Sequence, residues 1–270
     1  MSRLDARLFL APERMDETGK RRALVPISRQ KGCEMTEETD ASGFNSQIKP
    51  YLVQGTGLKD HQVELLTILK QHCEANPRNL LDVGCASGTM LSALHNEFPA
   101  TSLVGLDIAA DLIELAKAKV GEFSHLVCDD AVSWLPDTTF DVIVASGVLS
   151  IWEDFRVPLQ RWLSWLADKG LLLIFGRFNS RDVDTIIRFR LEGDDFWQGG
   201  LTSYSTTSVS KYLDSLGKKH SWIPFTLARD LMPSADPIAT WTETTSEGRK
   251  LVINGANVIA QHYFLMISNQ

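Results

Sequence analysis

Residues 79–88, NLLDVGCASG, place a short apolar run directly before an acid and a turn of small residues. The run ends at Asp82, and the turn follows as Gly84-Cys85-Ala86-Ser87-Gly88. Glycine permits positive φ and close approach of a ligand, and the first N–H groups of a following helix point into such a turn. The stretch therefore predicts a parallel strand that passes into a helix beneath a nucleotide-like ligand.

Three further apolar runs repeat this pattern. Residues 102–107, SLVGLD, end in Asp107; HLVCDDA ends in Asp129 and Asp130; FDVIVASG stops at Ser146-Gly147. Each run closes with an acid or a small polar residue, and helix-length sequence separates the runs. The pattern predicts an α/β fold whose parallel strands feed one ligand-lined edge.

On these residues, the chain from about 60 to 176 resembles the class I S-adenosylmethionine-dependent methyltransferases. The family motif is an acid, any residue and three glycines at alternate positions, which here reads Asp82-Val83-Gly84-Cys85-Ala86-Ser87-Gly88. Ala86 replaces the middle glycine. The resemblance implies a Rossmann-like, seven-stranded, mostly parallel sheet with an antiparallel last strand, and S-adenosylmethionine as the cofactor.

The resemblance assigns cofactor contacts around the first two runs. The turn from Gly84 to Gly88, with Cys85 and Ala86, would pack under the methionine part, and Asp82 would lie near its ammonium group. Asp107 would accept hydrogen bonds from both ribose hydroxyls, and Ile108 would stack on adenine. Two alternatives stay open, because Asp107 also suits the N-cap of the helix that follows and Cys85 suits a packed turn position better than a nucleophile.

The later runs and the segment before the first helix complete the expected cofactor site. Asp130 would accept from the adenine amino group, and the Ala131 N–H would meet a ring nitrogen. Either Asp129 or Asp130 could instead cap the next turn, and we favour Asp130 for adenine. Ser146 to Val148 would close the floor. Tyr51 is a candidate contact to the cofactor carboxylate, and a packing role is equally open.

The ends of the chain differ from the middle in composition. Residues 1–46 mix charges, Gly, Pro, Ser and Thr with little periodicity, which predicts a mobile arm that could serve as a lid. Residues 47–270 form the expected catalytic domain. Within it, residues 153–170 predict a helix stopped by Gly170 and residues 206–216 a helix stopped by Gly217. Strands are expected at 171–176, 220–227 and 261–267, the last two antiparallel.

Two insertions, at about 177–205 and 228–260, are expected to bind the acceptor, because loops above the carboxyl ends of parallel strands carry ligands. The candidate contacts are Trp152, Arg177, Arg181, Trp197 and Tyr204. Arginines suit a carboxylate or phosphate, but they could instead pair with the acids of their own segment. The second insertion predicts a β-hairpin whose edge could pair with a second copy of the chain.

Composition sets outer limits on function. The 270 residues are 44% hydrophobic and 23% charged, with a net charge of -7, which is ordinary globular usage and argues against nucleic acid as the partner. Cys33, Cys73, Cys85 and Cys128 show neither C-x-x-C pairs nor metal-ligand spacing. With no long apolar stretch and no secretory start, we expect a cytoplasmic protein without a metal and without membrane contact.

The resemblance implies methyl transfer to an oxygen or nitrogen of a small molecule or sugar, and we expect the acceptor to be anionic or a glycan. The catalytic residue stays unassigned, because Ser150 and Ile151 stand where family members often carry histidine. His220 and His262 could serve as a base, but a lone histidine on an apolar run favours a structural role. Glu153 and Asp154 face the right edge, and they also suit a helix N-terminus.

Two other classes stay open. A nicotinamide-dependent oxidoreductase also uses a strand, a glycine turn and an acid, although its G-x-G-x-x-G is absent here. A noncatalytic subunit with the same fold is the second alternative.

Overall fold

The computed structural model describes residues 57–73, 76–233, 236 and 238–269. The expected arm at 1–46 and the candidate Tyr51 lie outside these residues. None of the helices in the described ranges is long and apolar enough to cross a membrane.

A central sheet organises the chain, with strand order β3-β2-β1-β4-β5-β10-β7, and β6 pairs with β5 as its eighth strand. The strands β1 to β5 run parallel to one another, and β10 runs antiparallel to both β5 and β7. The fold class expected from the sequence is confirmed, including the reversed strand near the C-terminus. The strands are β1 Asn79–Val83, β2 Ser102–Asp107, β3 Ser124–Cys128, β4 Phe140–Ser146, β5 Leu166–Asn179, β6 Tyr204–Ser205, β7 Lys219–Phe225 and β10 His262–Ser268.

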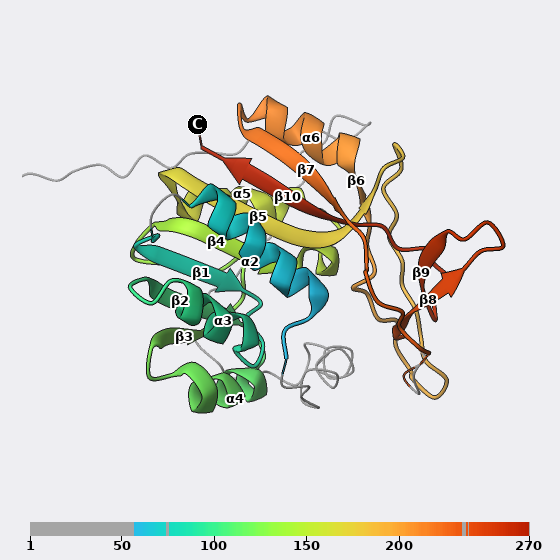
Figure 1. Ribbon diagram of the computed structural model, residues 1–270, viewed down its shortest axis with the longest axis horizontal. Helices are drawn as coiled ribbons and strands as arrows, with labels where there is room; N and C mark the ends of the chain where they lie inside the picture. The colour runs from blue at the N-terminus through green and yellow to red at the C-terminus, as the bar shows by residue number, and fades with distance from the viewer. Residues whose placement is uncertain (1–56, 74–75, 234–235, 237, 270) are drawn as a thin grey trace, which may run out of the picture. The chain divides into compact units, whose positions relative to one another are not determined.

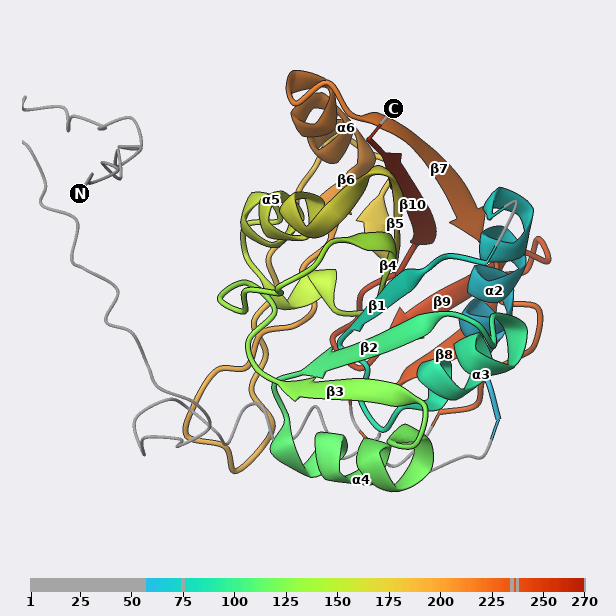
Figure 2. The same ribbon diagram turned by 90° about the vertical axis from the view of Figure 1, so that its left-hand side faces the viewer.

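Helices cover both faces of this sheet (Figure 2). Successive side chains of a strand point to opposite faces, so Leu80 packs with one helical layer and Leu81 with the other. The first layer holds α2 Asp60–His72, α3 Thr89–Glu97 and α4 Ala110–Val120; the second holds α5 Arg156–Trp165 and α6 Thr206–Ser215, with the short 3₁₀ helix η1 Leu149–Ile151. Two apolar cores therefore fix the sheet and hold its carboxyl edge in place.

The end of α5 differs from the expectation. The helix stops at Trp165, and β5 already begins at Leu166 instead of after Gly170. Leu166 pairs with Phe140, after which the β4–β5 register shifts. A Cβ at Gly170 would lie 3.0 Å from the Phe140 carbonyl oxygen, so this glycine allows close approach of two strands at an irregularity rather than ending a helix.

The segments 177–205 and 228–260 differ in structure. Residues 228–260 contain the expected hairpin, β8 Thr240–Thr244 and β9 Lys250–Asn254, paired antiparallel. The stretch 177–205 is mostly irregular, with bridges between Thr185 and Ser203 and between Phe189 and Gln198. Figure 1 shows the hairpin on the side toward which the β1 arrow points, which is the carboxyl edge of the parallel strands.

Candidate cofactor and acceptor site

The small-residue turn after β1 adopts the left-handed conformation at each glycine position of the motif. The φ angles are +73° at Gly84, +47° at Ala86 and +77° at Gly88. A left-handed backbone costs an L-residue roughly 1–2 kcal/mol. Ala86 adopts this glycine-like conformation although it carries a side chain. The N–H groups of Gly84 and Cys85 both donate to the Leu106 carbonyl, at 2.7 and 3.1 Å, and thereby fasten the turn to the end of β2.

Asp107, at the end of β2, bridges this turn to the next helix. Its carboxylate accepts from the backbone N–H of Ala86 and from that of Ala109, each at 2.9 Å. Burial raises the pKa of Asp107, while the hydrogen bonds from Ala109 and Ala86 act in the opposite direction. The N-cap of α4 is Ala109, so the carboxylate supports the helix start without being the cap residue.

Two buried oxygen atoms near this edge have no hydrogen-bond partner among the residues that the structure describes: Asp82 Oδ2 and Ser146 Oγ. Asp82 is 2% exposed. Its burial, together with the negative charge of Asp107, raises its pKa to about 8. An unpaired buried polar atom costs about 1–3 kcal/mol, which a ligand ammonium or hydroxyl would offset. The residues present therefore fit a cationic nucleoside such as S-adenosylmethionine.

The end of β3 supplies both expected acids, with distinct contacts. Asp130 Oδ1 accepts from the N–H groups of Val132 and Ser133, at 2.8 and 3.0 Å, and Asp129 Oδ1 accepts from the N–H of Asp130 at 2.7 Å. The capping role left open between these acids falls to Asp130. The carbonyl of Ala131 accepts from the indole N–H of Trp162 at 3.0 Å, which fixes the neighbouring backbone.

Two other expected cofactor residues differ sharply in exposure. Ile108 is 51% exposed, so its side chain is accessible for stacking on a base. Cys85 is 4% exposed, and burial, followed by the charges of Asp82 and Asp107, raises the pKa of its thiol. A raised pKa leaves no thiolate at neutral pH, so Cys85 is a packed turn residue.

Among the expected acceptor contacts, the structure separates exposed from buried side chains. Tyr204 is 2% exposed, and its hydroxyl donates to the carbonyls of Trp152 and Leu149. Contrary to our expectation, Tyr204 therefore supports the Trp152 backbone from within the core. The Trp152 ring packs edge-on against Trp162, with centroids 5.8 Å apart. Trp197 is 61% exposed and lies under the Arg190 guanidinium at 5.4 Å.

The acids after β4 are engaged by arginines. Glu153 accepts from Arg188, with Nε at 2.9 Å from Oε1, and Asp154 pairs with Arg156 at 2.7 Å. The hydrogen bond from Arg156 lowers the pKa of Asp154. Because arginines engage both carboxylates, the geometry favours neither Glu153 nor Asp154 as a general base. The sequence predicts that the arginines of 177–205 either bind an anionic acceptor or pair with acids of their own segment. Arg188 does neither, because its partner Glu153 lies before α5.

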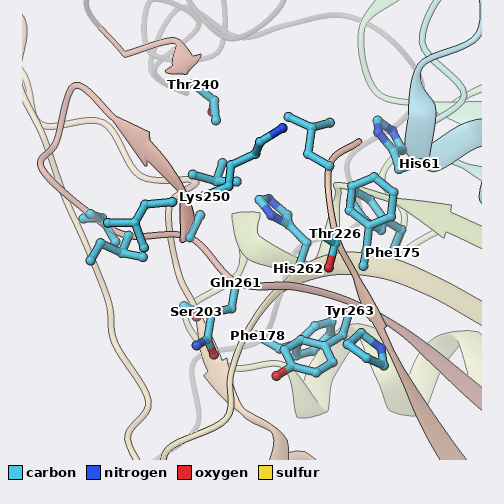
Figure 3. A pocket seen from close by; sticks show the side chains of 18 of the residues that line it. His61, Phe175, Phe178, Ser203, Thr226, Thr240, Lys250, Gln261, His262 and Tyr263 are labelled. Carbon is cyan, nitrogen blue, oxygen red and sulfur yellow. The ribbon is translucent and has the colours of Figure 1, made fainter. Parts of the chain in front are cut away.

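A cavity of about 940 Å³ opens between the start of α2, the ends of β5 and β7, the start of β10 and the hairpin. Figure 3 shows His61, Phe175 and His262 on one side of it and Lys250 of β9 on the other. The expected contacts Trp152, Arg181 and Trp197 do not line it, and Arg177 lies beside it as the register partner of His262.

Two histidines stack on one phenylalanine at the cavity wall. The His61 ring lies 4.3 Å from Phe175 at an interplanar angle of 4°, and the His262 ring lies 5.5 Å away at 10°. Burial, then the charge of Lys59, lowers the pKa of His61 to about 3. Burial, then the charge of Arg177, lowers the pKa of His262 to about 4. Both imidazoles are therefore neutral at pH 7.

The sequence reasoning missed this group. The sequence favours a structural role for His262 on a late strand, and it predicts no role for His61. The polar triplet Lys59-Asp60-His61 at the start of a predicted helix was the available local signal.

Phe175 connects the cavity to the cofactor edge. It pairs with Ser146 in the parallel β4–β5 ladder, and its carbonyl accepts the N–H of Gly147 at 2.8 Å. The wall of the cavity and the floor expected beneath the cofactor are thus adjacent positions of neighbouring strands.

Comparison with known proteins agrees with this geometry. A family model described as a methyltransferase domain matches residues 81–172, which include the turn, Asp107 and the ends of β3 and β4. This match supports the resemblance of residues 81–172 to the class I S-adenosylmethionine-dependent methyltransferases. A methyltransferase match over the turn and Asp107 favours methyl transfer over the nicotinamide-dependent alternative.

Curated relatives include two kinds of methyltransferase. Trans-aconitate 2-methyltransferase of Methylobacterium radiotolerans is 31% identical over 98 residues, 36% of this chain and 37% of that protein. The enzyme of the same name from Acidovorax sp. strain JS42 is 24% identical over 69% of this chain and 74% of that protein. Malonyl-[acyl-carrier protein] O-methyltransferase 1 of Ilyobacter polytropus is 27% identical over 46% of each chain. The first alignment thus spans little more than a third of its relative.

Solved structures share the fold over nearly the whole chain. A plantazolicin methyltransferase in complex with a triazolic substrate analogue and SAH gives a TM-score of 0.55 at 13% identity, covering 86% of this chain and 92% of that one. An amino pentose methyltransferase from Micromonospora echinaspora, bound to SAM, gives 0.52 at 14% identity, covering 90% and 100%. At such identities the likeness is one of fold.

Proposed function

We propose that this methyltransferase transfers the methyl group of S-adenosylmethionine to a carboxylate oxygen of a small acid held in the cavity. The observation that carries the proposal is the position of Phe175, which lines the cavity and pairs with Ser146 at the cofactor edge. An acceptor in the cavity would therefore lie next to the methyl donor. The names of the relatives, which methylate trans-aconitate and malonyl-[acyl-carrier protein], support a carboxylic acid.

The cofactor contacts expected from the sequence form part of this proposal. Asp82 would hold the ammonium group, Asp107 the ribose hydroxyls and Ile108 one face of adenine. Asp130, which also caps the next turn through Oδ1, and the Ala131 N–H would hold the adenine edge. The support is the pair of unpartnered oxygens at Asp82 and Ser146 and the exposure of Ile108.

A carboxylate acceptor explains why no base is evident near the cofactor edge. The bound cofactor supplies a methyl group already activated on a sulfonium. A carboxylate is ionised at pH 7, so it needs no deprotonation, and Glu153 and Asp154 are free to serve as ion-pair partners of Arg188 and Arg156. The chain then contributes alignment and exclusion of water, which can lower a barrier by roughly 7–11 kcal/mol.

The arm, the domain bounds, the location and the pairing of copies expected from the sequence are also part of this proposal. We propose that residues 1–46 act as an arm over the site of a catalytic domain at 47–270, with acceptor-binding insertions at about 177–205 and 228–260. Cytoplasmic location and pairing through the hairpin edge are supported by the cysteine pattern and by the two-stranded hairpin sheet.

The direct test incubates the full chain with S-adenosylmethionine and trans-aconitate or malonate, and follows S-adenosylhomocysteine and methyl ester by mass spectrometry. We expect ester formation, abolished by Asp107→Asn. Turnover on amines or sugars with none on any carboxylic acid would contradict the carboxylate. Cofactor binding without transfer to any acceptor would favour the noncatalytic alternative.

A further inference from the structure

The cavity wall carries more positive than negative charge. Among the described residues that line it, the basic side chains are Lys59, Arg229, Arg249 and Lys250, and the acidic one is Asp60. Asp60 is already paired with Arg229 at 3.2 Å. Counting also Asp230, which pairs with Lys250 from outside the lining, two acids face four cations, so the cavity favours an anionic occupant.

Lys250 of β9 is held over the cavity by residues of its own insertion. Its ammonium donates to the Ala228 carbonyl at 3.1 Å and pairs with Asp230 at 2.8 Å. Asp230 is 71% exposed while Lys250 is 29% exposed, so the partner carboxylate stays hydrated and weakly bound. Figure 3 shows the Lys250 side chain extending from the hairpin toward the part of the cavity where His262, Phe175 and His61 lie.

The opposite wall adds hydrogen-bond donors in a positive field. The nearby charges are Lys59 and Asp60 at the start of α2, Arg177 on β5, Arg229 after β7 and the pair Arg249–Lys250 on the hairpin. His262 is neutral in this field, and a neutral imidazole still presents one N–H donor. A negative group between His262 and Lys250 would therefore meet a donor on one side and an ammonium on the other.

We propose that Lys250 and His262 bind an anionic group of the acceptor other than the one that is methylated. The acceptor is then a small molecule with at least two anionic groups, of which the second is a carboxylate or a phosphate. This inference rests on the proposed function, because it assumes that the acceptor occupies the cavity. It makes the hairpin the element that selects the acceptor, since charge-assisted bonds are stronger and more specific than neutral ones.

Calorimetry on the full chain saturated with S-adenosylhomocysteine tests this site. The probes are glutarate, 3-phosphonopropanoate and butyrate, which share one carboxylate and differ in whether the second group is a carboxylate, a phosphonate or a methyl group. We expect at least one of the first two to bind tenfold or more tightly than butyrate, and the better of them identifies the group. Lys250→Gln should weaken that probe about tenfold and change butyrate less than twofold. The control is Lys219→Gln on β7, which is exposed and outside the cavity.

His262→Gln provides the second arm, because glutamine keeps an N–H donor while His262→Leu does not. We expect Gln to retain most of the preference and Leu to lose it, with unfolding temperature recorded for both. The inference would be overturned if all probes bound equally or none bound. It would also be overturned if Lys250→Gln weakened the binding of butyrate and of the dianion equally. Selective binding without methylation of any carboxylic acid would instead contradict the proposed function and leave the anion site standing.

Discussion

The carboxylate of Asp107 accepts a hydrogen bond from the backbone N–H of Ala86 at 2.9 Å. Ala86 has φ +47° and stands where the family motif has its middle glycine. A single acid thus holds in place the one residue of the turn whose side chain opposes the left-handed backbone. Since the same carboxylate is the expected ribose ligand, the shape of the turn and cofactor binding depend on one side chain.

Ala86→Gly should stabilise the protein by up to about 1 kcal/mol, because it removes the cost of left-handed backbone at this position. Loss of the methyl group, which packs near Ala109 and Leu112, limits the gain. Urea unfolding measures the change. Ala118→Gly, at an exposed position inside α4, is the matched control and should destabilise by about 1 kcal/mol. A loss of stability at both positions would show that Ala86 is not strained.

Asp107→Asn should weaken S-adenosylhomocysteine binding tenfold or more. A carboxamide can accept only through one oxygen, so it cannot serve the N–H groups of Ala86 and Ala109 together with ribose hydroxyls. The free energy of unfolding should fall by about 1–3 kcal/mol. Calorimetry at a temperature where circular dichroism shows the variant folded separates the two effects. Undiminished affinity in the folded variant would remove Asp107 from the proposed cofactor site.

The parts of the molecule that sequence alone predicts are those encoded locally. Asp82, Asp107 and Ser146 each end an apolar run, and the ends of parallel strands meet at one edge because of the fold itself. The same local reasoning was wrong at the end of α5, where Gly170 resembles a helix stop. A Cβ at Gly170 would instead lie 2.7 Å from the Leu166 side chain and 3.0 Å from the Phe140 carbonyl of a neighbouring strand, and no local pattern contains the second contact.

The cavity could not be predicted because its wall is assembled from distant segments. His262 reaches Phe175 only because β10 inserts between β5 and β7, and His61 comes from a helix more than a hundred residues earlier in the chain. Pairing of Arg188 with Glu153 is similarly nonlocal. Sequence therefore located the cofactor edge and the hairpin, but the residues that face the acceptor depend on tertiary pairing.

Cofactor affinity should rise with pH up to about 8. In the free protein the pKa of Asp82 is raised to about 8, so the carboxyl is largely protonated at pH 7, whereas a ligand ammonium beside it favours the ionised form. Binding of S-adenosylhomocysteine should then release a proton from Asp82, and affinity should fall by up to tenfold per pH unit below 8.

Titrations at pH 7 in buffers of different ionisation enthalpy measure this proton release. Asp82→Asn removes the titrating group and should abolish the proton release that the wild type shows on binding. Identical proton release in the two proteins would mean that Asp82 is already ionised or does not face the ligand.

Acid should weaken the folded state through the histidines that stack on Phe175. Their pKa values are about 3 for His61 and about 4 for His262, against 6.5 in the unfolded chain. Between these values the unfolded chain binds protons that the folded chain does not, so their contribution is complete above pH 6.5 and is lost as pH falls. By pH 5 the loss is on the order of 2 kcal/mol per histidine. Asp82 acts oppositely, since its raised pKa favours the folded state as pH falls below 8.

The contribution of one histidine is isolated by comparing wild type with His262→Gln, because Asp82 is the same in both. Urea unfolding at pH 7 and pH 5 gives the fall in the free energy of unfolding of each protein, and this fall should be about 2 kcal/mol smaller in the variant. Equal falls would show that His262 takes up a proton as readily in the folded chain as in the unfolded one. The imidazole would then be charged when the cavity is filled at mildly acidic pH, and an anionic group beside it would be bound by two cations instead of by one cation and a neutral donor.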